Sequence, residues 1–191
     1  MSETKGIVVY CASSADIDPK YFEFARSVGR EIARRGYTLV SGGGRGGLMA
    51  AAIDGALEEG GDTIGVLPDF MIERQWNHRR LGTTLTTSSM HERKKTMADL
   101  SCAAIALPGG VGTLDELFEI ITWRQLGLYK GNVVIANAYG FYDLLLEHLQ
   151  STADKRFMRS DNLWTVATTP EDAVKKAVGP ISPVHDPGIK Y

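Results

Sequence analysis

The sequence is short of the residues that metal sites and disulfide frameworks need. Its 191 residues include two cysteines and four histidines. Two cysteines are too few for a disulfide framework or a cysteine-based zinc site, so we interpret Cys11 and Cys102 as small buried hydrophobic residues. The histidines form no HExxH pair and have no second ligand at metal spacing. We therefore expect a protein that holds no metal ion.

Long hydrophobic runs and an excess of one charge are also absent. The early apolar run at residues 6–12 is far shorter than the about 20 residues of a membrane span. The start also lacks the basic segment and long apolar stretch of a signal peptide. The formal net charge is -2 and the isoelectric point about 6.1, which argues against a general nucleic-acid binder. We expect a cytoplasmic protein that binds neither membranes nor nucleic acids.

Short apolar segments alternate with helical patterns along the chain. Continuously apolar segments predict buried strands at residues 7–10, 37–40, 63–67, 103–107 and 132–136, with a weaker one at 163–166. Helical patterns lie at residues 19–36 and 48–59 and after Ser89, Thr113, Phe141 and Pro170. This alternation predicts an α/β fold, a Rossmann-like doubly wound parallel sheet with helices on both faces. We expect a single nucleotide-binding domain at 1–178 and an extended or disordered tail at 179–191.

Glycine, with 21 residues, is abundant and clustered. Residues 41–47 follow the second predicted strand, residues 108–113 follow the strand at 103–107, and each cluster leads into a helix. Ligands of such sheets bind beyond the carboxyl ends of the strands. Glycine lets the backbone approach an anion closely, and the N–H groups of the following helix face it. Two such turns predict a site for a phosphate and its sugar, although turn geometry alone also calls for glycine.

The first cluster also fits a dinucleotide site. Gly42, Gly44 and Gly47 satisfy the pattern GxGxxG, and Asp69 follows at about the spacing of a ribose-binding acid. Against this interpretation, the cluster follows the second strand rather than the first. It also leaves the second glycine turn unexplained.

The helix after the second cluster carries two acidic residues on one face. Thr113 and Glu116 have the spacing of a capping box, in which Thr113 caps the helix, and spacing alone favours this interpretation. Alternatively, Glu116 and Glu119 project together beside the phosphate-binding turn. A carboxylate pair there would stabilise a cationic transition state or orient a water molecule.

An arginine lies where the pattern predicts an apolar helix face. Met90 and Met97 are seven residues apart, and Arg93 is on the face they define. Either its stem packs while the guanidinium reaches water, or the guanidinium is fixed in a cleft and binds phosphate, ribose hydroxyls or a carboxylate. We interpret Lys94 and Lys95 as a solvated surface, although Lys94 is within reach of an anionic ligand.

Several motifs together resemble one family. Residues 108–116 read PGGVGTLDE, residues 90–94 read MHERK, residues 41–49 contain SGGG and GLM, and residues 122–127 read TWRQLG. In this order they resemble the LOG (Lonely Guy) family of cytokinin riboside 5′-monophosphate phosphoribohydrolases, long labelled possible lysine decarboxylases. The likeness covers roughly residues 5–178.

The resemblance implies hydrolysis of the N-glycosidic bond of a purine nucleoside 5′-monophosphate, AMP included, without a metal or organic cofactor. It implies that Arg93 and Glu116 are the catalytic pair. It also implies a homodimer with the site near the subunit interface. The other residues expected at the substrate are Ser14, Gly42, Gly43, Gln75, Met90, Lys94, Gly109, Gly110, Val111, Gly112, Thr113, Leu114, Asp115, Glu119 and Thr122.

Two residues depart from the family pattern. Ala12 stands where many members have glycine, and Gln75 stands where a substrate-binding glutamate is expected, beside Trp76. A preference for AMP therefore remains an alternative to a preference for cytokinin nucleotides. A non-catalytic carrier of a nucleotide or of the molybdenum cofactor is the alternative function, and the intact Arg93 and Glu116 favour the enzyme.

Overall fold

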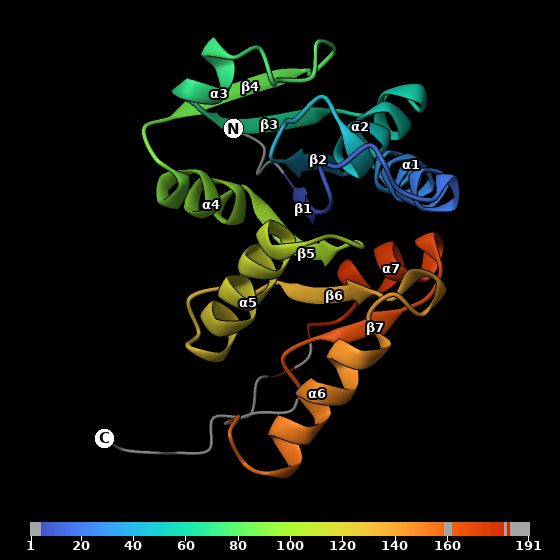
Figure 1. Ribbon diagram of the computed structural model, residues 1–191, viewed down its shortest axis with the longest axis vertical. Coiled ribbons are helices and arrows are strands. Elements are labelled where there is room, and N and C mark those ends of the chain that lie inside the picture. The colour runs from blue at the N-terminus through green and yellow to red at the C-terminus, as the bar shows by residue number, and fades with distance from the viewer. Residues whose placement is uncertain (1–4, 159–161, 182, 184–191) are drawn as a thin grey trace.

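The computed structural model describes residues 5–158, 162–181 and 183. Seven strands form one sheet in the order β4-β3-β2-β1-β5-β6-β7, and every neighbouring pair is parallel (Figure 1). The strands are β1 Gly6–Tyr10, β2 Thr38–Ser41, β3 Thr63–Pro68, β4 Thr83–Thr87, β5 Ser101–Ala106, β6 Asn132–Ala136 and β7 Thr165–Ala167. This sheet confirms the predicted fold class.

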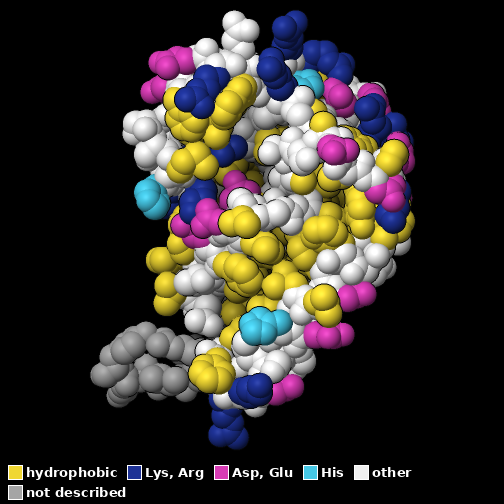
Figure 2. Space-filling model, viewed as in Figure 1, with side chains coloured by type: hydrophobic (Ala, Val, Ile, Leu, Met, Phe, Trp, Pro, Cys, Tyr) yellow, Lys and Arg dark blue, Asp and Glu magenta, His cyan; other side chains and the backbone are white. Residues whose placement is uncertain are grey.

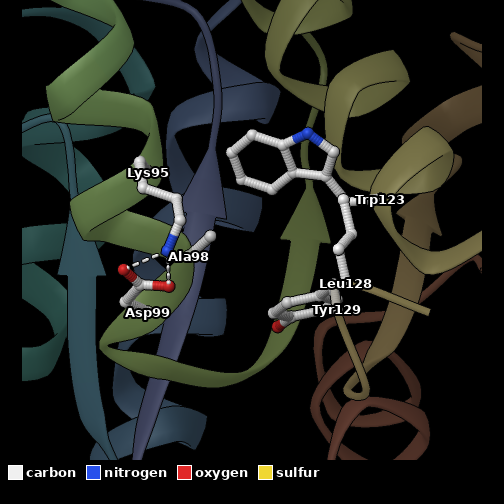
Figure 3. Close-up of a pocket in the computed structure, with 6 residues that line it drawn as sticks. All are labelled: Lys95, Ala98, Asp99, Trp123, Leu128 and Tyr129. Carbon is white, nitrogen blue, oxygen red and sulfur yellow. Dashed lines mark hydrogen bonds and ion pairs between the residues drawn. The ribbon is translucent and has the colours of Figure 1, made fainter. Parts of the chain in front are cut away.

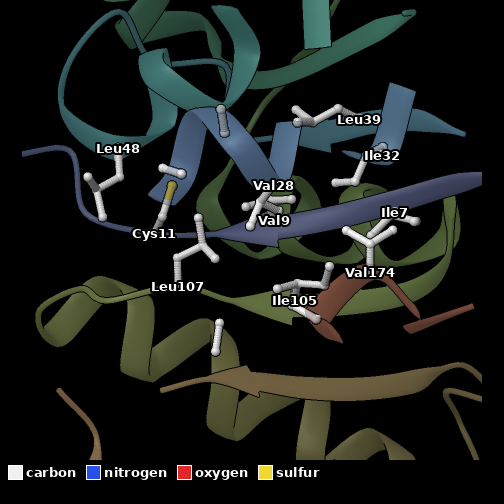
Figure 4. Packing of buried hydrophobic residues seen from close by; sticks show 14 of the residues in the cluster. Ile7, Val9, Cys11, Val28, Ile32, Leu39, Leu48, Ile105, Leu107 and Val174 are labelled. Atoms are coloured by element: carbon white, nitrogen blue, oxygen red, sulfur yellow. The ribbon is translucent and has the colours of Figure 1, made fainter. Parts of the chain in front are cut away.

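Helices cover both faces of the sheet. They are α1 Pro19–Arg34, α2 Gly47–Glu58, α3 Asp69–Glu73, α4 Met90–Asp99, α5 Val111–Gln125, α6 Asp143–Asp154 and α7 Pro170–Ala177, with a short 3-10 helix at Ala138–Gly140. One hydrophobic core lies between the sheet and α1, α2 and α7, and a second lies between the sheet and α4, α5 and α6. Figure 4 shows Val9, Val28 and Ile105 meeting in the first core.

The residues around the start of α1 explain why this helix begins at Pro19. The Asp18 carboxylate accepts the backbone N–H of Lys20 at 3.0 Å, and Pro19 occupies the first helical position, where its missing N–H costs nothing. Ala25, Val28 and Ile32 then bury one stripe of α1. The residues of this segment therefore determine both where α1 begins and which of its faces is buried.

The order of strands reverses between β1 and β5. From β1 the chain adds β2, β3 and β4 on one side and then β5, β6 and β7 on the other. The loops that leave the carboxyl ends of β1 and β5 consequently diverge to opposite faces and open a crevice. The backbone N–H of Ala12, just after β1, donates to the carbonyl of Pro108, just after β5, at 3.1 Å and ties the two loops together.

The surface is mixed in charge. Figure 2, seen from the same side as Figure 1, shows hydrophobic side chains exposed in the middle of this face and basic and acidic side chains mixed above them. Neither sign forms a continuous surface on this face, in line with the net charge of -2.

The structure differs from the sequence predictions at several places. Strand β4 and helix α3 were not predicted, because β4 has the polar sequence TTLTT at the sheet edge and α3 has only five residues. Cys11 is buried as predicted, but Cys102 is exposed, since it lies near the amino end of β5. Most of the predicted tail at 179–191 lies outside the described residues.

Candidate active site

A cavity of about 680 Å³ lies at the crevice between β1 and β5. Its walls come from the loops after β1, β2 and β5, from the start of α2, from α3 and the loop that follows it, and from α4 and the first turns of α5. The residues that line it are Cys11, Ala12, Ser13, Ser14, Gly44, Arg45, Gly46, Met49, Met71, Trp76, Met90, Arg93, Gly110, Val111, Gly112, Thr113, Asp115 and Glu116.

The Arg93 guanidinium is fixed at the wall of this cavity. The residue is only 6% exposed. Its Nε donates to the Val66 carbonyl at 2.9 Å and its Nη2 to the Gly42 carbonyl at 3.0 Å. Burial lowers the pKa of Arg93, and the nearby Glu116 opposes this effect. The prediction of a guanidinium fixed in a cleft is correct, and the alternative of a guanidinium in water is wrong because main-chain carbonyls hold it inside.

Glu116 lies on the second turn of α5 and borders the same cavity. Burial raises the pKa of its carboxyl group to about 7, although the charge of Arg93 opposes the rise. In the described part of the chain, no hydrogen bond or ion pair joins Glu116 to Arg93. Burial thus favours the protonated form of Glu116 more than water does, and the carboxyl group remains available to a bound molecule.

The capping-box interpretation of Thr113 and Glu116 is wrong. Helix α5 begins at Val111, its N-cap is Gly110, and Gly110 offers no side-chain hydrogen bond. Thr113 is a buried residue inside the first turn because the helix extends back through Gly112 to the glycine turn. The cap therefore does not account for Glu116.

Lys94 is paired with the carboxylates of α5. Its Nζ lies 3.0 Å from Asp115 Oδ2 and 3.2 Å from Glu119 Oε1. Burial disfavours the charge of Lys94, but hydrogen bonds to Asp115 and Glu119 outweigh this and raise its pKa. The interpretation of Lys94 as solvated surface is wrong, since it is 8% exposed; Lys95 is exposed as expected. Lys94 does not border the cavity, but its partner Asp115 does.

The glycines of the second cluster have two different reasons. A Cβ on Gly109 would overlap with the Thr113 side chain, so packing requires glycine there. Cβ atoms on Gly110 and Gly112 would meet no heavy atom within 4 Å, and neither residue has a positive φ. Both border the cavity, so packing does not require glycine at these two positions and the backbone there is open to close approach of a ligand. The start of α5 is therefore suited to an anion.

Packing accounts for most of the first cluster. A Cβ on Gly42 would overlap with the Arg93 guanidinium, and Gly43 and Gly47 have φ values of +66° and +61°. Gly44 and Gly46 border the cavity. Asp69 is exposed at the start of α3 and does not border the cavity, so the arrangement does not favour the dinucleotide interpretation.

The structure brings together about half of the predicted site residues. Those on the cavity wall are Ser14, Met90, Arg93, Gly110, Val111, Gly112, Thr113, Asp115 and Glu116. Those away from the wall are Gly42, Gly43, Gln75, Lys94, Gly109, Leu114, Glu119 and Thr122. The Thr122 hydroxyl donates to the Phe118 carbonyl within α5 at 2.7 Å, and Gln75 is exposed.

Sequence reasoning missed Arg45, Met49 and Met71 on the cavity wall. Arg45 and Met49 belong to the first glycine cluster and to the GLM motif, so their neighbourhood was a usable signal. Met71 had none, because it reaches the cavity through the unpredicted α3. Ala12, the departure from the family glycine, is outside the left-handed region, so its Cβ brings no backbone strain.

A second cavity of about 320 Å³ lies between the ends of α4 and α5 and contains none of the predicted site residues. Figure 3 shows Trp123, Leu128 and Tyr129 on one side of it and the Lys95–Asp99 pair on the other.

In the described residues, no three His, Cys, Asp or Glu side chains form a possible metal cluster. No helix in that part of the chain is long and apolar enough to cross a membrane.

Comparisons with known proteins agree with these motifs. Residues 49–177 match the family model described as possible lysine decarboxylase. The cytokinin riboside 5′-monophosphate phosphoribohydrolase LOG of Oryza sativa subsp. japonica is 38% identical over 88% of this chain and 70% of that protein. A cytokinin riboside 5′-monophosphate phosphoribohydrolase of Rhodococcoides fascians is 39% identical over 81% of this chain and 78% of that protein.

A solved structure shares the fold. The molybdenum cofactor binding protein of Rippkaea orientalis superposes with a TM-score of 0.72 and 23% identity, covering 92% of this chain and 96% of that one. At this identity the likeness shows the architecture and does not extend to the ligand.

Proposed function

The chain belongs to the LOG family, whose model is described as possible lysine decarboxylase, and on this premise we propose that it is a nucleoside 5′-monophosphate phosphoribohydrolase. It hydrolyses the N-glycosidic bond of a purine or cytokinin nucleoside 5′-monophosphate and releases the free base and D-ribose 5-phosphate. AMP is included among its substrates.

One observation carries this proposal. Arg93 and Glu116 border one cavity together with the glycine-lined start of α5. The free N–H groups at the start of a helix favour a phosphate. A carboxylate one turn further along the same helix then lies near the sugar that the phosphate carries. A carrier protein needs the phosphate site but has no evident need for the buried carboxylate.

The reaction follows from these positions. As the bond between ribose C1′ and the base nitrogen breaks, its electron pair leaves with the base and positive charge develops on the ribose. The Glu116 carboxylate stabilises that charge and orients a water molecule. The water gives its hydroxyl group to C1′, and its proton balances the charge of the departing base. Arg93, fixed by the Val66 and Gly42 carbonyls, contributes a charge to the wall for the ribose phosphate or for Glu116.

Of the remaining predicted residues, some contact the substrate and others hold the contacting residues in place. We assign the phosphate to the backbone of Gly110, Gly112 and Thr113, and we assign Lys94 to holding Asp115 in place through their ion pair. We also propose that the protein is cytoplasmic and works as a homodimer. Exposed apolar side chains on and after α5, among them Phe118, Leu126 and Leu128, support an interface on this helix.

A product assay tests the proposed function. The protein is incubated with AMP or with isopentenyladenosine monophosphate, and free base and ribose 5-phosphate are both measured. We expect equal amounts of the two products from at least one nucleotide. Tight nucleotide binding without turnover of either substrate would instead support the carrier.

The Glu116→Gln variant tests the catalytic role of the carboxylate. It keeps the size of the side chain and removes the charge, so we expect turnover to fall by about 100-fold or more while the melting temperature does not fall below that of the wild type. A variant that melts much earlier but keeps its activity per folded molecule would assign Glu116 to stability alone.

A further inference from the structure

The walls of the active-site cavity change in polarity from one end to the other. Gly110 and Gly112 lie beyond β5 and offer backbone groups, whereas Met71 and Trp76 come from the segment that follows β3. Two strands, β2 and β1, separate β3 from β5 in the sheet. The segment that carries Trp76 folds back to Arg45 in the loop after β2, so with about 4.8 Å between neighbouring strands the two ends are roughly 10 Å apart, which suits a nucleotide.

The backbone holds Trp76 firmly at its end of the cavity. Its N–H donates to the Met71 carbonyl at 2.9 Å, and its carbonyl accepts the N–H of Arg45 at 2.9 Å. The preceding Gln75 has a φ of 55°, a left-handed conformation that residues other than glycine rarely adopt. This turn directs Trp76, while Gln75 itself stays exposed and off the cavity wall.

The indole of Trp76 is supported from outside yet remains open. Phe70 packs against it edge-on, with 6.4 Å between ring centroids, and the Arg74 guanidinium carbon lies 5.2 Å from the ring centroid. Trp76 is nevertheless 42% exposed and borders the cavity. A rigid, flat and partly uncovered aromatic ring is a suitable surface on which a nucleic-acid base can stack.

We propose that Trp76 determines base specificity by stacking on the purine ring; this rests on the proposed function. The described residues that line this end are Gly44, Arg45, Met49, Met71, Trp76 and Met90, and none of them carries a carboxylate or a side-chain amide. The side chains of this end therefore offer the adenine amino group no carboxylate or amide oxygen as an acceptor, and only backbone carbonyls are left for that role. The base is therefore selected by its ring area, so adenine and adenine with an apolar substituent on N6 are both accepted, and pyrimidines are not.

Steady-state kinetics of Trp76→Ala and Trp76→Phe test this role. We expect Trp76→Ala to raise the KM for AMP and for isopentenyladenosine monophosphate by roughly tenfold to hundredfold, the range of a lost stacking contact. Trp76→Phe should recover most of the loss. The inhibition constant of ribose 5-phosphate, which has no base, should not change. An unchanged KM in Trp76→Ala, or an equal weakening of ribose 5-phosphate, would overturn the proposal.

Tryptophan fluorescence tests the contact without turnover. In Glu116→Gln, we expect AMP to quench the emission while ribose 5-phosphate does not. The quench should disappear on adding Trp76→Phe and persist on adding Trp164→Phe, because Trp164 is not on the cavity wall. A quench that survives Trp76→Phe would refute the contact. Wild-type protein that cleaves neither nucleotide would refute the proposed function, and this binding test would still decide the role of Trp76.

Discussion

Glu116 and Arg93 are both ionisable residues on the cavity wall, where burial disfavours the charged form of each. They differ in the partners that compensate for this burial. Arg93 has two main-chain acceptors for its guanidinium, whereas burial raises the pKa of Glu116 to about 7. Removing a carboxylate from water without enough compensating partners favours its protonated form. Glu116 therefore changes charge in the pH range where the protein is expected to work.

We predict that kcat/KM rises with pH and levels off above about 7, because the carboxylate form of Glu116 is the one that stabilises the cationic ribose. Below that pH, kcat/KM should fall by up to tenfold per unit. The measurement is a pH–rate profile with AMP. A profile that falls through neutral pH as the pH rises would mean that Glu116 acts in its protonated form.

The same shift affects the stability of the fold. The folded protein keeps the Glu116 proton between about pH 4.5 and 7, where the unfolded chain has released it. The residue therefore lowers stability progressively as the pH rises through this interval. The Glu116→Gln variant lacks this pH dependence of stability. The melting temperature of the variant minus that of the wild type should therefore increase between pH 5 and 8.

At the scale of single residues, the sequence predicted the position of some side chains but not the partners that hold them. Arg93 is buried, as the spacing of Met90 and Met97 predicted, although Met90 itself is 40% exposed. Its acceptors, the carbonyls of Gly42 and Val66, were not predictable, because a bond to the main chain leaves no mark on the residue type of its acceptor. The left-handed Gln75 was hidden for a similar reason, since backbone conformation there depends on the packing of Trp76 and Met71.

At the scale of elements, helix α5 combines an open start with the carboxylate one turn later. We predict that Gly112→Ala separates the two roles of this turn. Alanine is a better helix residue, and its Cβ meets no heavy atom within 4 Å, so the free energy of unfolding should rise by about 0.4–1 kcal/mol. The same Cβ obstructs the approach of the phosphate, so the KM for AMP should rise by about tenfold.

Chemical denaturation and steady-state kinetics check both halves of the Gly112→Ala prediction. Inhibition by ribose 5-phosphate should weaken together with AMP binding, whereas inhibition by free adenine, which has no phosphate, should stay unchanged. Equal weakening of both inhibitors would mean that the substitution disturbs the whole cavity instead of the phosphate end.

Elements that are buried on both sides were predicted well, and those at the margin were not. The apolar strands and the capped helices α1, α4 and α7 follow from their own residues. Strand β4 was missed because TTLTT, although rich in β-branched threonine, has no apolar run, and α3 has too few residues to show a periodic pattern. Both depend on neighbours that a local pattern does not contain.

At the scale of the molecule, the proposed homodimer is open to a direct test. Leu128 is 72% exposed beside the cavity of Figure 3, and Leu144 on α6 is 81% exposed. We predict that the wild type sediments as a dimer, that Leu128→Glu sediments as a monomer, and that the matched Leu144→Glu stays dimeric. Sedimentation velocity distinguishes the three proteins. A wild type that sediments as a monomer would refute the dimer, and dissociation by Leu144→Glu alone would move the interface to α6.

The whole-molecule architecture was predictable because the alternation of strands and helices constrains it strongly. The order of strands places the carboxyl ends of β1, β2 and β5 at one edge, so two glycine clusters 60 to 70 residues apart in sequence could be expected at one crevice. The base end was not predicted in the same way, because it is built from α3 and the loop after it.

The two main-chain acceptors of Arg93 have an evolutionary consequence. A side-chain partner would have to be preserved through every generation, but the carbonyl of Val66 persists whichever apolar residue stands there. Gly42 is constrained by the space that the guanidinium needs, and Met90 supplies a sulfur acceptor for Nη1 at 3.7 Å. The cation of the site is thus insulated from mutational drift in its surroundings, while Trp76, on a separate segment, is free to vary. Descendants of this chain can exchange the base they accept without rebuilding the groups that cleave it.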